Sequence, residues 1–369
     1  MVHTMNRWQL AAIIINFTVG SSLLMAPNMT AAYAGKDGWL SMLLACALGV
    51  LCNLLLLYLL SKYQYSSIFD IAEQIAGKIG GTLFTILFLF ITLHLTALVL
   101  RNFSNFMTTV LLPEVRPDSF EIMMVILVIF SVSKGVQNIA RINEIIAPLM
   151  IIFILLTLIL VSNNLESENI LPVLDQGWHA IFHGAYPVFG FPFIEMIVFT
   201  AFLPFVADKT WLKTYYLFAL TIAGLLLSAA ILVTIGVEGE SIAKREVYSA
   251  YSMARSIELG TLFQRVEAFI GIVWMVALFV KITVCFLSVQ FCLSHLSRSG
   301  DYYSFLFPTG LLVWTMSSHL HHDLIDFTEF VAKNWTLYWL SLYIIIILLL
   351  FIGLLFGKHK RLPKPKKSA

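Results

Sequence analysis

Long runs of apolar residues, separated by short polar turns, fill almost the whole of this 369-residue chain. A membrane-spanning helix needs about 20 consecutive apolar residues. On that criterion the pattern predicts ten spans, of which the fourth and the ninth are short. They cover residues 8–34, 38–61, 82–111, 120–133, 144–162, 180–206, 215–237, 266–295, 302–318 and 335–357. The longest gap, 238–265, reads as a polar and partly amphipathic loop, so no separate soluble domain is expected.

Two of the apolar runs are interrupted by residues that weaken helices. The first run contains TVGSSLLMAP (Thr18–Pro27), and the sixth contains VFGFPFIEMIVFTAFLP (Val188–Pro204). Each interrupted run opens one half of the chain when the ten spans are divided five and five. Interrupted spans at corresponding positions of two halves are typical of transporters built on inverted repeats. The pattern therefore predicts an all-α membrane protein, a five-plus-five inverted repeat over about 8–162 and 180–357 with broken helices 1 and 6.

Composition agrees with a membrane protein, because 59% of the residues are hydrophobic and 12% are charged, against about 25% charged in soluble domains. With the N-terminus cytoplasmic, the inner loops and the basic tail 358–369 hold 14 Lys and Arg, and the outer loops hold 7. This asymmetry predicts that both termini are cytoplasmic. The first apolar run is long enough for a span, so no cleavable signal peptide is expected. The cysteines all lie in apolar runs and are expected to be packing residues; they are Cys46, Cys52, Cys285 and Cys292.

The interruption in the first run is made of small residues, Gly20, Ser21 and Ser22, two positions after Thr18. A helix broken here would leave backbone N–H groups free. Those groups and the dipole of the outer half-helix favour a bound carboxylate. The alternative is a small-residue face that packs closely against a neighbouring helix. We take these four residues as candidate ligand-binding residues.

The interruption in the sixth run is stronger, because it combines Gly190 and Pro192 with an acid, Glu195, about one turn further on. Glycine permits unusual backbone angles, and proline removes a backbone donor. Freed backbone groups at membrane depth must be satisfied by protein or by a water-filled cavity. An acid at that depth is costly and is functional by default. Phe189, Gly190, Phe191 and Glu195 are therefore candidate ligand-binding residues; the alternative for Glu195 is a structural acid that holds the freed groups or pairs with a base.

Three further charged or titratable residues lie inside predicted spans. Lys281 is near the middle of span eight and can brace Glu195. His94 is near the middle of span three, where it is either a packing residue or a further ligand contact. Arg101 lies two turns beyond His94 and is either a further ligand contact or a residue that extends its guanidinium toward the membrane surface.

Catalytic signatures are absent from the sequence. It contains no phosphate-binding loop, no H-E-x-x-H motif and no G-x-S-x-G motif, so we expect neither enzyme activity nor a cofactor. His321 and His322 stand beside Asp323 and Asp326 in the loop between spans nine and ten. Their spacing makes no closed metal site, and a solvated loop is the expected arrangement.

Several longer motifs give the chain a resemblance to a known family. They are KGVQNIARINEIIAPL (Lys134–Leu149), ENILPVLDQGWHAI (Glu168–Ile181), FPFIEMIVFTAFLP (Phe191–Pro204) and the RVEAF…W opening of span eight (Arg265–Trp274). With these motifs the chain resembles the B subunit of Ger-type spore germinant receptors, the spore germination permease branch of the amino acid–polyamine–organocation superfamily. The resemblance implies the ten-span inverted-repeat fold, the inner membrane of the spore, and a complex with an A membrane subunit and a C lipoprotein subunit. It also implies that the chain senses a small germinant such as an amino acid.

The resemblance also assigns roles to residues. Gly20 to Ser22 fall on the break of span one, and Phe189, Gly190, Phe191 and Glu195 fall on the break of span six. Two departures stand out: Ser22 replaces a glycine that superfamily members often have, and Ile194 replaces a glycine before the acid. Both narrow the pocket and suggest a smaller or more apolar ligand. Lys281 can stand for the sodium ion that related transporters bind between spans one and eight.

Three functions remain open from the sequence. The first is a germinant-binding receptor subunit, and the second is an active amino-acid transporter coupled to protons or sodium, because broken helices also serve alternating access. The third is an ion or water conduit or a scaffold for companion subunits. The low polarity of the spans disfavours a conduit.

Overall fold

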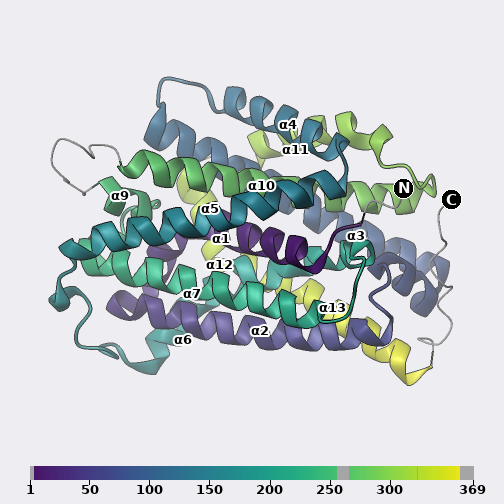
Figure 1. Cartoon of the computed structure of the whole chain (residues 1–369), viewed down its shortest axis with the longest axis horizontal. Helices are drawn as coiled ribbons and strands as arrows, with labels where there is room; N and C mark the ends of the chain where they lie inside the picture. Colours follow the sequence, from purple (N-terminus) through teal and green to yellow (C-terminus); the bar gives the residue numbers. More distant parts are fainter. Residues whose placement is uncertain (1–3, 256–265, 322, 358–369) are drawn as a thin grey trace.

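The computed structural model describes residues 4–255, 266–321 and 323–357, with the backbone alone for 266–270. Its regular structure is helical, apart from one isolated bridge between Met5 and Val206. The long helices lie side by side in one elongated bundle (Figure 1). The α-helices are α1 (Arg7–Ala34), α2 (Gly38–Lys62), α3 (Ile68–Phe106), α4 (Pro117–Ser133), α5 (Val136–Val161), α6 (Gly177–Val188), α7 (Leu212–Glu238), α8 (Glu240–Ala243), α9 (Ser249–Arg255), α10 (Val266–Ser297), α11 (Leu306–Leu320), α12 (Leu324–Lys333) and α13 (Trp335–Leu355).

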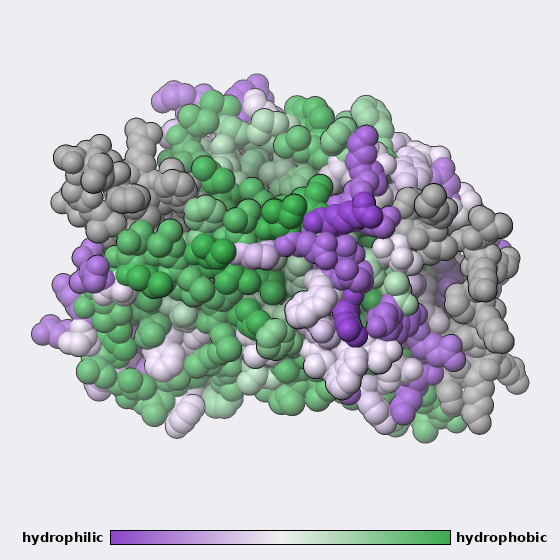
Figure 2. Space-filling model, in the orientation of Figure 1, coloured by the Kyte–Doolittle hydropathy of each residue, from purple (hydrophilic) through white to green (hydrophobic). Residues whose placement is uncertain are grey.

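Apolar side chains cover the middle of the bundle on the face seen in Figure 2, and hydrophilic side chains gather toward its ends. Within the described residues, seven helical stretches are long and apolar enough to cross a membrane. The first of these, Arg7–Lys62, contains both α1 and α2. α4 and α11 have 17 and 15 residues and are shorter than a full span. The chain is therefore a multi-pass, all-helical membrane protein, while the number of ten spans and the inverted repeat stay predictions.

Helix α1 lies at the centre of the bundle (Figure 1), where it packs against α5, α6, α7 and α10. It is apolar on all sides, as a helix surrounded by others must be. The expected break at Gly20–Ser22 is wrong, because α1 is one continuous α-helix from Arg7 to Ala34. A Cβ on Gly20 would lie 2.9 Å from the carbonyl oxygen of Ala277 on α10. The small residues therefore serve close helix packing, which was the alternative left open by the sequence.

The break in the sixth apolar run is confirmed. Helix α6 ends at Val188 and is followed by a wide π-type turn, η5 (Phe189–Ile194), and a 3₁₀ segment, η6 (Glu195–Ala201). Phe191 inside η5 has non-helical angles, φ −114° and ψ 103°. Gly190 is needed here because a Cβ on it would lie 2.5 Å from Cα of Thr336 on α13. The break thus lets the chain pass directly against the start of α13.

Neighbouring side chains satisfy the carbonyl groups that the break exposes. Asn53 on α2 donates from Nδ2 to the carbonyl oxygen of Phe193 at 3.1 Å. The hydroxyl of Tyr216 on α7 lies 3.0 Å from the carbonyl oxygen of Met196 and 3.1 Å from Oδ1 of Asn53. All four residues are buried, so the hydrogen bonds replace water that the membrane interior cannot supply.

The region expected to be a polar loop is partly inside the bundle. Helix α9 packs against α1, α7 and α10, and Tyr248, Ala250 and Met253 are buried. Helix α9 enters the bundle because it has an apolar face, although the residues before and after it in sequence are polar. The rest of this loop, 256–265, and the basic tail 358–369 lie outside the described residues. The cysteines are free, and only Cys52 is not fully buried, which confirms their expected role as packing residues.

Gly190→Ala should destabilise the protein, because its Cβ must displace the backbone of Thr336 on α13. We expect a loss of roughly 1–3 kcal/mol, as for other overpacked cores, measured as a lower melting temperature of the purified protein in detergent. The matched control is Gly271→Ala in α10, whose Cβ would meet Tyr251 at an ordinary 3.5 Å. It should be neutral or slightly stabilising. Equal melting temperatures for both variants would contradict the close approach of η5 to α13.

Candidate functional site

A small cavity of about 20 Å³ lies beside the break of the sixth run, where α1, α3, α12 and α13 meet η5. It has room for about a single water molecule. Its lining combines polar and apolar side chains: Ser21, Met25, Leu95, Leu98, Val99, Asn102, Phe191, Glu195, Phe327, Val331 and Trp335. Of the residues singled out from sequence, Ser21, Phe191 and Glu195 line this cavity.

Glu195 and Lys281 form a fully buried ion pair next to the cavity. Nζ of Lys281 lies 2.6 Å from Oε2 of Glu195, and both side chains are 0% exposed. The same Nζ donates to Oγ of Ser21 on α1 at 2.6 Å. The other carboxylate oxygen, Oε1, accepts a hydrogen bond from Nε1 of Trp335 at 2.5 Å. One acid therefore connects η6 with α10, α1 and α13.

The electrostatic environment of Lys281 is well matched to a buried cation. Besides Glu195 and Ser21, its ammonium lies over the rings of Phe17 and Phe191, at 4.9 and 4.8 Å from their centroids. Such contacts stabilise a desolvated cation. Removing one member of a buried pair leaves an uncompensated charge and costs about 3–5 kcal/mol. The pair is thus a strong structural constraint, and it is the contact that the bracing alternative for Lys281 expects.

The remaining residues predicted at span one and span six lie near the cavity without lining it. Oγ1 of Thr18 is 3.6 Å from Sδ of Met196. Ser22 is fully buried, and its hydroxyl has no hydrogen-bond partner among the described residues. Phe189 is half-buried and packs against the core. Gly190 faces Thr336. These positions shape the walls around the break.

His94 is close to the cavity through an aromatic cluster. Its Nδ1 lies 3.3 Å from the hydroxyl of Tyr338, and its ring meets Trp335 edge-on at 5.8 Å. Phe330 on α12 contacts the same imidazole at 5.7 Å. His94 therefore packs against Trp335, and its own side chain is not part of the cavity lining.

Arg101 belongs to a second buried ionic contact that the sequence did not reveal. Its Nη1 lies 3.6 Å from Oε1 of Glu121 on α4, a side chain that is 0% exposed. Ser104 and Ser318 also donate to this carboxylate, at 2.7 and 2.9 Å. The guanidinium thus points into the bundle between α3, α4 and α11, in contrast to the expected extension toward the membrane surface.

Two polar residues of the cavity were missed by the sequence reasoning. Trp335 is the first residue of α13 and appeared only as the start of an apolar run. A buried indole N–H needs a partner, but the sequence does not say which. Asn102 is 2% exposed, and its Oδ1 lies 3.2 Å from the hydroxyl of Tyr248.

The segment between spans nine and ten is more ordered than a solvated loop. His321 is 7% exposed, and its Nδ1 lies 3.0 Å from Oδ2 of Asp326. Asp323 caps the start of α12 by accepting from the backbone N–H of Asp326 at 2.8 Å. His322 lies outside the described residues. In the described part of the chain, no group of three or more acidic, His or Cys side chains could hold a metal ion.

The fold is similar to those of solved membrane transporters. One is Mhp1, a nucleobase-cation-symport-1 family transporter in a closed conformation with bromovinylhydantoin bound; the TM-score is 0.67 at 11% identity, covering 98% of this chain and 94% of that one. Another is a Na⁺-coupled sialic acid symporter in a substrate-bound outward-open state, with a TM-score of 0.67 at 12% identity, covering 95% and 80%. At this identity the similarity concerns the fold alone.

Sequence comparison identifies the family. The chain is 26% identical to spore germination protein KB of Bacillus subtilis (strain 168) over 312 residues, covering 84% of this chain and 83% of the relative. It is 28% identical to spore germination protein YndE of the same organism, covering 79% and 80%, and 21% identical to spore germination protein XB of Bacillus anthracis, covering 76% and 78%. The family model described as "Spore germination protein" matches residues 4–316. The chain therefore belongs to the spore germination protein family of permease-type membrane proteins.

Proposed function

We propose that this chain is the membrane subunit of a spore germinant receptor, which binds a small amino acid at the break between α6 and η6 and passes the resulting closure to partner subunits. One observation carries the proposal. The cavity beside the break brings a buried acid, an amide and a hydroxyl together with apolar side chains. This is the composition expected of a small-molecule site.

The lining chemistry suits a zwitterion with an apolar side chain. Glu195 is the acceptor for its ammonium group, since a carboxylate with two partners still has acceptor capacity. Ser21 and Asn102 supply hydrogen-bond donors for its carboxylate. Met25, Leu95 and the other apolar walls take its side chain. This assignment agrees with the narrower pocket that Ser22 and Ile194, as departures from the family pattern, suggested.

Ligand binding requires the site to open, because about 20 Å³ holds no amino acid. In this proposal the site opens to admit the amino acid and then closes around it, and this second closure is the signal. A ligand can shift the balance between closed and open forms only by its different affinity for the two. We therefore expect modest, state-dependent binding. That behaviour is suitable for a sensor whose closure is read by an A membrane subunit and a C lipoprotein subunit.

The wider architecture in this proposal is ten spans in a five-plus-five inverted repeat, with both termini cytoplasmic in the inner membrane of the spore. Similarity to Mhp1 over 98% of this chain supports the repeat architecture. The excess of Lys and Arg in the inner loops supports the orientation.

In this proposal Lys281 not only pairs with Glu195 but also serves as a fixed positive charge between α1 and α10. Its ammonium bridges Ser21 on α1 and Glu195 on η6. A sodium ion in a related transporter would supply the same positive charge at such a contact. The chain then needs no bound sodium to hold these helices together.

A second candidate function is active amino-acid transport. Its support is the likeness of the fold to two cation-coupled symporters. Alternating access uses the same kind of broken helix.

Glu195→Gln alone should both destabilise the protein and abolish ligand binding, since it leaves Lys281 buried without its counter-charge. Combining Glu195→Gln with Lys281→Met removes both charges and should recover most of the loss of about 3–5 kcal/mol. We expect the double variant to be stable yet unresponsive, measured by thermal shift with amino acids and by germination of spores that carry it. A double variant with wild-type response would show that Glu195 only braces the break.

Ligand binding should be independent of sodium. Thermal shifts induced by the active amino acid should be equal in sodium chloride and in choline chloride, because Lys281 already supplies the charge. A steep rise of affinity with sodium concentration would refute the role of Lys281 as a fixed cation.

An uptake assay in liposomes distinguishes the receptor function from the transporter function. The purified subunit should bind its amino acid but accumulate little of it, with or without a proton or sodium gradient. Robust gradient-driven uptake, lost in the Glu195→Gln and Lys281→Met double variant, would overturn the receptor function in favour of transport.

A further inference from the structure

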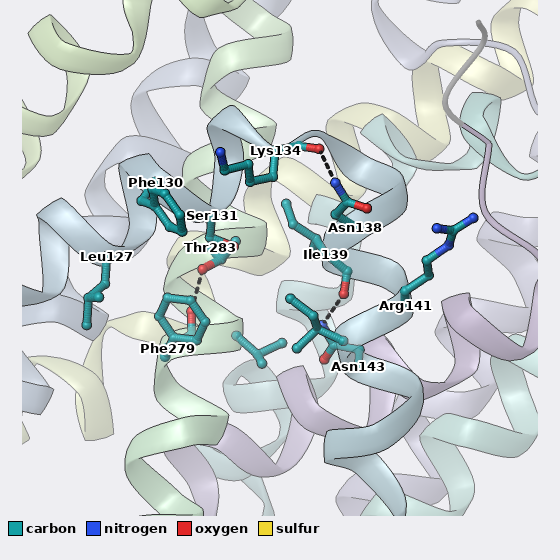
Figure 3. Close-up of a pocket in the computed structure, with 12 residues that line it drawn as sticks. Leu127, Phe130, Ser131, Lys134, Asn138, Ile139, Arg141, Asn143, Phe279 and Thr283 are labelled. Carbon is teal, nitrogen blue, oxygen red and sulfur yellow. Dashed lines mark hydrogen bonds between the residues drawn. The ribbon is translucent and has the colours of Figure 1, made fainter.

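A second, larger hollow lies away from the proposed amino-acid site. It is a crevice of about 420 Å³ between α4, α5 and α10 (Figure 3). Its inner walls are mainly apolar and include Ile139, Phe279 and Val280. Two polar side chains in it are already bonded: Thr283 to the carbonyl of Phe279 at 2.7 Å, and Asn143 to the carbonyl of Ile139 at 2.8 Å. The interior therefore suits a hydrocarbon chain.

The rim of the crevice is cationic. Lys134 and Arg141 line it together with Asn138, and no acidic side chain does. Neither cation forms an ion pair within the described residues. In Figure 3 the lysine and the arginine extend on opposite sides of Asn138, so they flank the rim. Helix α5 also begins here, at Val136, and its N-cap residue Gly135 makes no side-chain cap. The free N–H groups of the first turn add a partial positive charge.

The outer wall of the crevice is an exposed apolar surface, as expected for a wall that faces lipid. Leu127, Phe130 and Ile142 line it and are 48%, 61% and 50% exposed. Lys134 lies over the ring of Phe130 at 4.7 Å, so its charge stands at the border of this apolar surface. A water-soluble anion would leave the apolar walls empty. An occupant with a long apolar part and an anionic head satisfies both halves of the crevice.

We propose that this crevice binds an anionic phospholipid, with one acyl chain between α4, α5 and α10 and the anionic headgroup on the rim that Lys134 and Arg141 flank. Basic pockets between membrane helices recognise anionic headgroups in this way. The bound chain would contact both α5 and α10. It would therefore reinforce the packing behind Asn143, whose Oδ1 accepts from Nδ2 of Asn16 on α1 at 2.6 Å.

The test uses the purified full-length chain and native mass spectrometry. Delipidated protein is incubated with an equimolar mixture of phosphatidylglycerol and phosphatidylcholine that carry the same acyl chains. We expect wild type to retain phosphatidylglycerol over phosphatidylcholine by on the order of tenfold. Lys134→Gln with Arg141→Gln should retain both lipids equally. Equal retention by wild type, or an unchanged preference in this double variant, would overturn the proposal.

Matched controls separate this site from general charge attraction. Lys62→Gln with Lys213→Gln removes the same charge elsewhere, and Lys62 also lies over an aromatic ring, that of Tyr58, at 4.8 Å. This variant should keep the full preference, and losing it would attribute the effect to overall charge.

A second variant and a competing anion test the proposed position of the acyl chain in the crevice. Thr283→Leu keeps all charges but fills the crevice, so it should lose retained phosphatidylglycerol while its melting temperature in detergent stays close to wild type. Undiminished retention would contradict the position of the chain. Millimolar inorganic phosphate should leave bound phosphatidylglycerol in place; complete displacement by phosphate would show a headgroup site without a lipid.

Discussion

The buried ion pair between Lys281 and Glu195 is the interaction on which the centre of the molecule depends. Both side chains are 0% exposed, so each remains charged at acceptable cost only because the other is present. Ser21 and Trp335 extend the contact to α1 and α13. Four elements that are far apart in sequence therefore meet at one electrostatic contact, and their relative positions set the shape of the cavity.

The backbone of the break is held in a different way, by neutral hydrogen bonds. Asn53 and Tyr216 bond the carbonyls of Phe193 and Met196. The carboxylate of Glu195 can only accept hydrogen bonds, and its two oxygens accept from the ammonium of Lys281 and the indole of Trp335. The broken backbone and the buried acid are therefore held by separate sets of partners.

The sequence predicted the features whose signal is local. Glycine and proline weaken a helix wherever they occur, so Gly190 and Pro192 were enough to predict the break of the sixth run. A charge within an apolar run must find a partner, so the contact between Lys281 and Glu195 could also be expected from sequence. The first run was ambiguous, because Gly20 permits a break and close packing equally well. The carbonyl of Ala277 on α10 decides for packing. The contact of Trp335 with Glu195 could not be predicted from sequence, because it depends on which helix ends meet in the folded chain.

An unbroken α1 also changes how the site can respond. Helix α1 offers the hydroxyl of Ser21 to the cavity, where a broken helix would offer backbone N–H groups. In the proposed function, recognition therefore uses side chains and the break of the sixth run. Helix α12 covers the cavity with Phe327 and Val331. Withdrawing it exposes apolar surface, at about 1.5–3 kcal/mol per side chain, without separating the buried charges. Because α13 begins two residues after α12 ends, movement of α12 reaches Trp335 and, through its indole, the carboxylate of Glu195. In the proposed function, opening of the cavity therefore shifts Trp335 and its hydrogen bond to Glu195, while the contact between Glu195 and Lys281 is kept.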